Sequence, residues 1–265
     1  MKKISLIFLT LILTFTLFTG CGKEENSNKI KIGVSPVPHS EIIEFIKDDL
    51  EKDGVEVEIV EFTDYIIPNK ALDDKDIDAN FFQHEPYMND FREKENLDIV
   101  SLGAVHIEPM GLFSTKHDNI NDLKDGSTIA IPNDATNGGR ALLLLEQNGL
   151  IKLDDKAGLL ATENDIVENP KNLEIEALEA AQLPRVLNDL DGAIINGNYA
   201  LEADLVPTED ALILEEKDSP FANIIAIRKG EENEEKFKIL MKHIQSDKVK
   251  KFIEDNYEGT LIPAF

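Results

Sequence analysis

The sequence predicts an α/β protein built from two lobes, and three observations lead to this fold class. Short apolar segments alternate with amphipathic ones along most of the 265-residue chain, which is typical of strands alternating with helices around mostly parallel sheets. The series is long for one sheet, and no obvious linker interrupts it. We therefore expect two lobes joined by more than one crossover, with the last helices returning to the first lobe.

The first series of predicted elements begins with Ile30–Ser35, a short apolar strand. Over Ser40–Lys52, apolar side chains recur on one side of a predicted helix, which ends at Gly54. Strict alternation over Val55–Phe62 predicts a half-exposed strand. The elements that follow are a helix over Tyr65–Leu72, a strand over Ile77–Phe82, a helix over His84–Asn96, and one long or broken strand over Asp98–Thr115.

A second series begins with a strand over Ser127–Pro132 and a helix over Thr136–Asn148, which Gly149 closes. The Leu142–Leu145 run in this helix is apolar all round, so we expect the helix to be buried on most sides. The remaining predictions are strands over Leu173–Leu178, Gly192–Asn196, Ala211–Leu214 and Asn223–Arg228, and helices over Glu179–Leu190, Tyr199–Leu205, Asn233–Ile244 and Asp247–Tyr257.

The crossovers between the lobes are expected near Leu112–Lys116 and Asp218–Ile225. Residues 29–113 and 224–265 would then form lobe 1, and residues 114–223 would form lobe 2. In sheets of this kind, ligands bind beyond the carboxyl ends of the strands.

The N-terminal residues 1–20 have the parts of an export signal: Lys2 and Lys3, then an apolar run over Ile4–Phe18, then small residues. The run is short for a bilayer span, which takes about 20 apolar residues. An ordinary membrane anchor helix is the alternative. Cys21, the only cysteine, stands where bacterial lipoproteins are cleaved and acylated, and the segment resembles such a site.

Residues 21–28 would then be a lipidated flexible tether, because GKEENSN contains no apolar residue to bury. The chain has 27 Lys and Arg against 52 Asp and Glu, a net charge of −25. Such a charge repels phosphate backbones and anionic lipid, so we expect no nucleic-acid partner and no membrane attachment besides the acyl anchor. The protein is expected on the extracytoplasmic face of the cell membrane.

The segment PNDATNGGR, which ends at Arg140, is the strongest candidate for a binding site. It turns from a strand into a helix, where free backbone N–H groups attract an anion. Gly138 and Gly139 would let a ligand approach the backbone, and Arg140 could bind a carboxylate with two parallel bonds. The alternative is a simple N-cap by Asp134 or Thr136 with Arg140 on the surface.

His106 and Glu108 are separated by one residue, so both would point the same way on a strand. Together with His84 they just reach the three ligands that a catalytic zinc needs. The other histidines show no metal-ligand spacing, and we expect no metal. Enzyme and cofactor motifs such as G-x-S-x-G, a Walker loop, H-E-x-x-H and G-x-G-x-x-G are absent from the sequence. We expect a protein that is not an enzyme and holds no cofactor; a hydrolase with paired carboxylates is the alternative in so acidic a chain, although nothing in the sequence singles out a pair.

Five segments together resemble the NlpA-type lipoproteins, the methionine-binding receptors of bacterial ABC importers. They are Asp78–Tyr87 (DANFFQHEPY), His106–Met110 (HIEPM), Pro132–Arg140 (PNDATNGGR), Glu168–Leu173 (ENPKNL) and Gln182–Arg185 (QLPR). The resemblance runs from about residue 30 to the C-terminus. It implies a type 2 periplasmic-binding-protein fold, in which two α/β lobes with mixed sheets close on a ligand by a hinge.

The resemblance also implies a ligand-binding site with four parts. The ligand carboxylate would be bound by Arg140 and Asn137, and the amino-acid backbone atoms would be held by Asn196 and Asn223. The thioether would be surrounded by Tyr65, Phe82, His84 and His106. Glu108 would tune the ligand or pair with its ammonium group. On pattern alone, Tyr65, Phe81 and Phe82 belong to the core.

The implied function is a lipid-anchored receptor that delivers methionine to a permease with a separate ATPase. Glu108 departs from the aromatic residue of some family members, so L-methionine, D-methionine and a methionyl dipeptide all stay open as ligands. A metal-binding lipoprotein and a surface adhesin are the alternatives from other classes.

Overall fold

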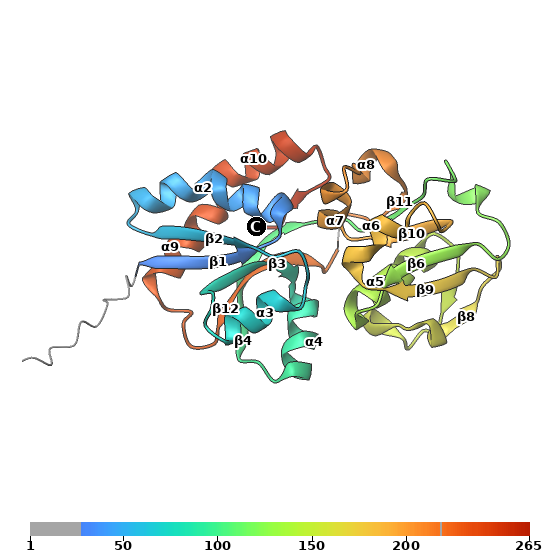
Figure 1. The fold of residues 1–265 in the computed structure, drawn as a ribbon, viewed down its shortest axis with the longest axis horizontal. Coiled ribbons are helices and arrows are strands. Elements are labelled where there is room, and N and C mark those ends of the chain that lie inside the picture. The colour runs from blue at the N-terminus through green and yellow to red at the C-terminus, as the bar shows by residue number, and fades with distance from the viewer. Residues whose placement is uncertain (1–27, 218) are drawn as a thin grey trace, which may run out of the picture.

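The computed structural model describes residues 28–217 and 219–265. The predicted signal peptide over residues 1–20, Cys21 and the predicted tether up to residue 27 lie outside the described residues. Two α/β bodies lie side by side along the longest axis (Figure 1), each around its own sheet. We call the body with the six-stranded sheet lobe 1 and the body with the five-stranded sheet lobe 2.

The sheet of lobe 1 is mixed and has the order β13-β4-β12-β3-β1-β2. Strand β1 pairs in parallel with β2 and β3, whereas β12 runs antiparallel between β3 and β4, and β13 is antiparallel to β4. The strands are β1 (Lys29–Val34), β2 (Glu56–Glu61), β3 (Ala79–His84), β4 (Ile99–Ile107), β12 (Ala222–Arg228) and β13 (Ile262–Pro263).

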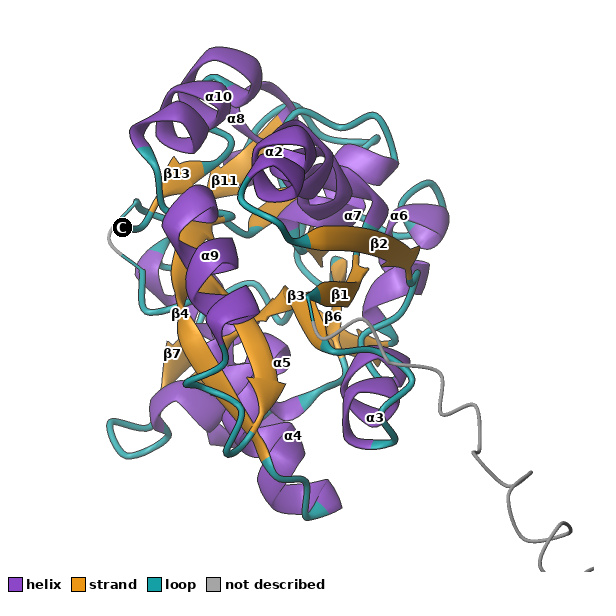
Figure 2. Cartoon of the chain, turned by 90° about the vertical axis from the view of Figure 1, so that its left-hand side faces the viewer, coloured by secondary structure: helices purple, strands orange, loops and turns teal. Residues whose placement is uncertain are grey.

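Helices cover both faces of this sheet. Helices α2 and α10 lie together on one side of the molecule and α3 and α4 on the other (Figures 1 and 2). Buried side chains of α2, α9 and α10 form one core with the strands, and those of α3 and α4 form a second. The elements are the short turn η1 (Pro36–Ser40), α2 (Glu41–Lys52), α3 (Ile67–Asp73), α4 (Glu85–Glu95), α9 (Glu235–Ile244) and α10 (Asp247–Tyr257).

Lobe 2 has a mixed sheet of order β11-β5-β10-β6-β9 and a separate β7-β8 pair. Its strands are β5 (Gly111–Phe113), β6 (Thr128–Pro132), β7 (Lys152–Leu153), β8 (Ile166–Glu168), β9 (Glu174–Leu178), β10 (Gly192–Ile195) and β11 (Ala211–Leu214). Its helices are α5 (Ala135–Gln147), α6 (Leu183–Val186), α7 (Gly197–Glu202) and α8 (Pro207–Asp210), with short 3-10 turns η2 (Ile120–Asp122), η3 (Gly158–Leu160), η4 (Glu163–Asp165) and η5 (Ala180–Gln182). As predicted, α5 is largely buried.

The first connection between the lobes lies a few residues before the predicted crossover, and the second overlaps the predicted range. The predicted strand over Asp98–Thr115 is broken: β4 ends at Ile107 in lobe 1, and β5 begins at Gly111 in lobe 2. Pro109 lies in the break and has no N–H to donate to a sheet. The second connection is residues 215–221, between β11 and β12. The predicted lobe 1 range 29–113 therefore includes β5, which pairs in the sheet of lobe 2.

Several predicted elements differ from the structure. The sheets are mixed, as the resemblance implied, and not mostly parallel as the alternation alone suggested. The helix predicted over Glu179–Leu190 is wrong: a short turn η5 is followed by the four-residue α6, in which Pro184 lies at the helix start. A proline is tolerated there but not in a helix interior. The short elements β7, β8, α8 and β13 were not predicted.

Candidate ligand-binding site

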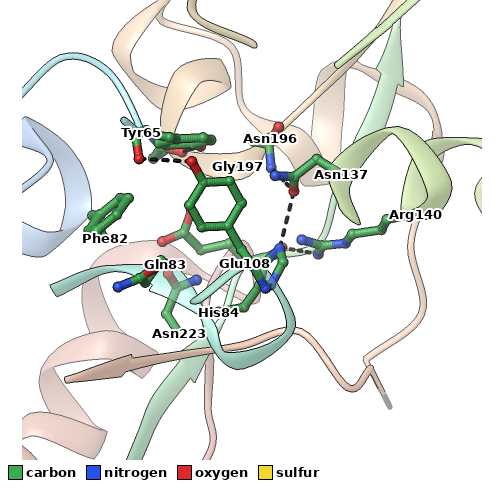
Figure 3. Close-up of a pocket in the computed structure, with 12 residues that line it drawn as sticks. Tyr65, Phe82, Gln83, His84, Glu108, Asn137, Arg140, Asn196, Gly197 and Asn223 are labelled. Atoms are coloured by element: carbon green, nitrogen blue, oxygen red, sulfur yellow. Dashed lines mark hydrogen bonds between the residues drawn. The ribbon is translucent and has the colours of Figure 1, made fainter. Parts of the chain in front are cut away.

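A cavity lies between the lobes, where strands β3, β6 and β10 end (Figure 3). This position follows the rule that ligands bind beyond the carboxyl ends of strands. Lobe 1 contributes side chains from β3, α4, β12 and the loop before α3, and lobe 2 contributes them from α5 and from the start of α7. The lining residues are Tyr65, Phe82, Gln83, His84, Tyr87, Glu108, Asn137, Arg140, Asn196, Gly197, Asn198 and Asn223.

Eight of the nine ligand residues that the resemblance implies line this cavity; they are Tyr65, Phe82, His84, Glu108, Asn137, Arg140, Asn196 and Asn223. His106 does not line it, because its fully buried ring lies against Glu108. Sequence reasoning missed Gln83, Tyr87, Gly197 and Asn198. The signal was present, since each of the four lies within three residues of a predicted site residue.

At the start of α5, Asn137 forms hydrogen bonds with three other side chains. The carboxylate of the N-cap residue Asp134 accepts from the Asn137 backbone N–H at 2.9 Å and from its Nδ2 at 3.0 Å. Because the amide nitrogen faces a carboxylate, Oδ1 faces the cavity, where it accepts from Asn196 Nδ2 at 2.8 Å and from His84 Nε2 at 3.1 Å (Figure 3). The Asp134 cap, expected as part of the alternative to a binding site, is present, and it orients a residue that lines the cavity.

The protonation of His84 follows from its neighbours. Its Nδ1 accepts the Tyr87 backbone N–H at 3.1 Å, so Nε2 carries the proton that it donates to Asn137. Burial, together with the charge of Arg140, lowers the pKa of His84 to about 3. His84 is therefore a neutral donor at physiological pH.

Arg140 is buried where α5 lies against the two connections between the lobes. The alternative that placed it on the surface is therefore wrong. Its Nε donates to Glu215 Oε1 at 3.0 Å, and its Nη2 donates to Glu215 Oε2 and, at 2.8 Å, to the backbone oxygen of Glu108. The guanidinium carbon also lies 4.5 Å from the ring centre of Phe221. The two-bond face predicted for a ligand carboxylate is thus occupied by Glu215, and Nη1 alone has no hydrogen bond among residues 28–217 and 219–265.

Gly138 and Gly139 have a different role from the one predicted. A Cβ on Gly138 would lie 2.9 Å from the Pro132 oxygen, and one on Gly139 would lie 2.3 Å from the Leu159 oxygen. Neither glycine is in the lining set. The missing side chains therefore let α5 pack closely against the chain's own backbone.

Glu108 is 5% exposed and lies in the first connection, where its Oε1 accepts from His106 Nε2 at 2.7 Å. Burial raises the pKa of the Glu108 carboxyl. The neighbouring His39 and the hydrogen bond from His106 lower the pKa by more than burial raises it, so the net pKa lies below the ordinary value. The metal set considered from sequence, with His84, is not assembled. In the described part of the chain, His39 takes the place of His84 beside His106 and Glu108.

Tyrosine hydroxyls join the two lobes beside the cavity. The Tyr65 hydroxyl of lobe 1 donates to Asn198 Oδ1 of lobe 2 at 2.5 Å, and the Tyr199 hydroxyl of lobe 2 donates to the Thr63 oxygen at 3.3 Å. The Tyr65 ring centre lies 5.9 Å from those of Phe82 and Tyr87. Phe82 therefore belongs to the cavity wall, whereas Phe81 is fully buried in the core of lobe 1.

Two α/β lobes with a cavity between them, lined by polar groups of both lobes, define a two-lobe ligand-binding protein. The chain belongs to the NlpA lipoprotein family, whose family model matches residues 30–265. The predicted family and fold, a type 2 periplasmic-binding-protein fold, are both confirmed. Among the described residues, no helix has the length and apolarity needed to cross a membrane.

Relatives and solved structures cover almost the whole chain. The D-methionine-binding lipoprotein MetQ of Salmonella typhimurium is 45% identical over 93% of this chain and 92% of its own length. That of Escherichia coli K12 is 43% identical, with the same coverage. A nutrient-binding protein from Burkholderia cenocepacia, solved bound to methionine, has a TM-score of 0.86 and 47% identity, over 89% of this chain and all of that one.

Proposed function

We propose that this protein is a lipid-anchored extracytoplasmic substrate-binding protein of an ABC importer, which binds methionine in the interlobe cavity and delivers it to the permease. It carries out no catalytic step. The observation that carries the proposal is the cavity itself: a guanidinium, a carboxylate and an aromatic wall meet there. This set matches a zwitterion with an apolar side chain, and the matched relatives are named for binding methionine.

Each part of the ligand has a partner in this arrangement. The ligand carboxylate would meet Arg140 Nη1 and the start of α5, where helix N–H groups favour an anion. The ammonium group would meet Glu108 and Asn196, whose Oδ1 is buried without a hydrogen-bond partner among the described residues. A buried acceptor of this kind costs free energy until a donor arrives.

The thioether would lie among Tyr65, Phe82 and Tyr87, since sulfur makes favourable contacts with aromatic rings. Asn223 lines the cavity on the lobe 1 side. Its Oδ1 accepts from His39 Nε2 at 3.3 Å, so its Nδ2 would meet the ligand backbone, as the resemblance implied. His106 has no place in this assignment, because it does not reach the cavity.

The anchor belongs to the same proposal. We expect cleavage before Cys21, acylation of its sulfur, and a tether that holds the folded lobes at the membrane. A cognate permease and a separate ATPase would complete the importer.

Calorimetric titration tests the ligand. The protein without residues 1–20 is unfolded and refolded to remove carried ligand, then titrated with L-methionine, D-methionine and glycyl-methionine. We expect micromolar or tighter binding of at least one of them. Arg140→Ala should weaken that binding by about 2–5 kcal/mol, because it leaves a buried carboxylate unpaired. Wild-type affinity in Arg140→Ala would refute the site, and no binding of any of the three by a folded sample would refute the ligand class.

A further inference from the structure

We propose that His39 and His106 are positioning residues: His106 donates to one oxygen of the Glu108 carboxylate, His39 packs against the same oxygen, and the other oxygen faces the cavity, where it selects ligands that carry an ammonium group. This inference rests on the proposed function, since it assigns the ammonium part of that site. It adds a residue, His39, that sequence spacing did not single out.

Both histidines contact the same carboxylate oxygen. His106 Nε2 lies 2.7 Å and His39 Nε2 lies 3.2 Å from Glu108 Oε1. Both imidazoles are fully buried, and the Phe81 ring packs edge-on against each of them, at 4.5 Å from His39 and 5.4 Å from His106. His106 Nε2 donates to Oε1 and restricts the rotation of the Glu108 carboxyl. The His39 Nε2–H donates to Asn223 Oδ1 at 3.3 Å, which holds the His39 ring against the same carboxylate oxygen.

Lobe 2 completes the enclosure of Glu108. A Cβ on Gly197 would lie 2.8 Å from Glu108 Cβ and 3.2 Å from its Oε2, so only glycine lets α7 approach this closely. Glu108 Oε2 has no hydrogen bond among the described residues, and it is not one of their fully buried unpaired atoms. Since Glu108 lines the cavity, Oε2 is the oxygen available to a ligand.

The unpaired ring nitrogens indicate how the cluster is protonated. The Nδ1 atoms of His39 and His106 are buried and have no partner among residues 28–217 and 219–265. An imidazolium would place an N–H at each Nδ1 with nothing to accept it, and such a donor is costly. The Nε2 atom of each ring therefore carries the proton, which His106 donates to Glu108 Oε1 and His39 donates to Asn223 Oδ1.

Few other charges act on this carboxylate. Arg140 approaches from α5 but is paired with Glu215, His84 at the end of β3 is neutral, and Glu202 on α7 adds a like charge. Burial by itself favours the protonated form of Glu108, and the nearby His39 and the hydrogen bond from His106 oppose it. Removing a donor should therefore make methionine binding sensitive to mild acid.

The experiment compares two ligands across pH in the refolded protein without residues 1–20. The ligands are the methionine isomer that the wild type binds more tightly and 4-(methylsulfanyl)butanoate, which lacks the ammonium group. Affinities are measured from pH 8 to pH 5.5 for the wild type, Glu108→Gln, His106→Leu and His106→Gln. The matched control is His117→Leu, which removes a histidine near Asp191 in lobe 2, outside the cavity.

We expect wild-type affinity for methionine to be nearly constant over this pH range. Glu108→Gln should weaken the binding of methionine about ten- to hundredfold and leave the affinity for the butanoate nearly unchanged, because only methionine donates a hydrogen bond to the carboxylate. His106→Leu should lose methionine affinity progressively as the pH falls, whereas His106→Gln, whose amide can donate to Oε1, should restore a flat profile. His117→Leu should behave as the wild type.

Three outcomes would overturn the inference. One is equal loss of both ligands in His106→Leu at every pH, which would mean that His106 only supports the fold. Another is unchanged methionine affinity in Glu108→Gln. The third is a zinc-dependent rise in melting temperature that His39→Gln abolishes, since a metal would take the same oxygen. All three outcomes can occur while Arg140→Ala still weakens methionine binding. The Arg140→Ala titration therefore tests the proposed function separately from this inference.

Discussion

Glu215 pairs with Arg140 on a face of the guanidinium that does not line the cavity. Glu215 follows β11 in the second connection, and its backbone N–H donates to the Met110 oxygen of the first connection at 2.9 Å. Its carboxylate also accepts from the Met110 N–H at 3.3 Å and from Ser219 Oγ at 3.2 Å. One side chain therefore ties Arg140 to both connections between the lobes.

Removing this carboxylate should destabilise the protein. We expect Glu215→Ala to lower the free energy of unfolding by about 3 kcal/mol, at the low end for a broken buried pair because Glu215 is 11% exposed. Denaturant unfolding measures the loss. Glu216→Ala, at the exposed neighbouring position, should change stability by no more than about 0.5 kcal/mol. Equal effects of the two substitutions would contradict the pairing.

Gly139→Ala should also destabilise the protein, although alanine is the better helix former. Helix propensity alone favours alanine by about 1 kcal/mol, but the new Cβ would lie 2.3 Å from the Leu159 oxygen and 3.0 Å from the Ala161 nitrogen. We expect a net loss of about 1–3 kcal/mol, as for other overpacked sites. Gly138→Ala, with its nearest atom at 2.9 Å, should lose less, and a melting-temperature series checks this order.

Tyr65→Phe should speed ligand release with little effect on folding. It removes the hydrogen bond between the lobes to Asn198, and one such bond contributes about 0.5–1.5 kcal/mol. We expect the dissociation rate of methionine, measured by stopped flow, to rise up to about tenfold. Tyr257→Phe is the matched control, since its hydroxyl bonds Glu41 within lobe 1. If both variants release ligand at the same rate, the contact does not hold the lobes together.

Stability should fall between pH 6.5 and pH 4.5. Burial lowers the pKa of His39 to about 4 and that of His84 to about 3, whereas both take up a proton near pH 6.5 once unfolded. Below pH 6.5 the unfolded state binds more protons, so the unfolding free energy decreases as the pH falls. At pH 5 the loss is roughly 2 kcal/mol for each histidine. His84→Gln should show about half of the wild-type loss in denaturant titrations at pH 7 and pH 5.

Much of the site could be predicted because its residues cluster in short motifs. Asn137, Arg140 and His84 lie beside strand ends that periodicity locates, and the family resemblance supplied Tyr65, Asn196 and Asn223. His39 and Glu215 could not be found in this way. Each contacts its partner across about 70 residues of chain, and no spacing in the sequence expresses such a contact.

The sequence by itself determined the α/β class, the order of most elements and the family, because local periodicity and short motifs carry that information. The tertiary structure alone decided that β5 pairs in the sheet of lobe 2, and that Glu215 takes the two-bond face of Arg140. It also decided that Gly138 and Gly139 pack against the chain's own backbone and not against a ligand. His106 likewise contacts Glu108 without lining the cavity. These features depend on which distant segments pack together, and strand pairing and side-chain burial settle that only in the folded chain.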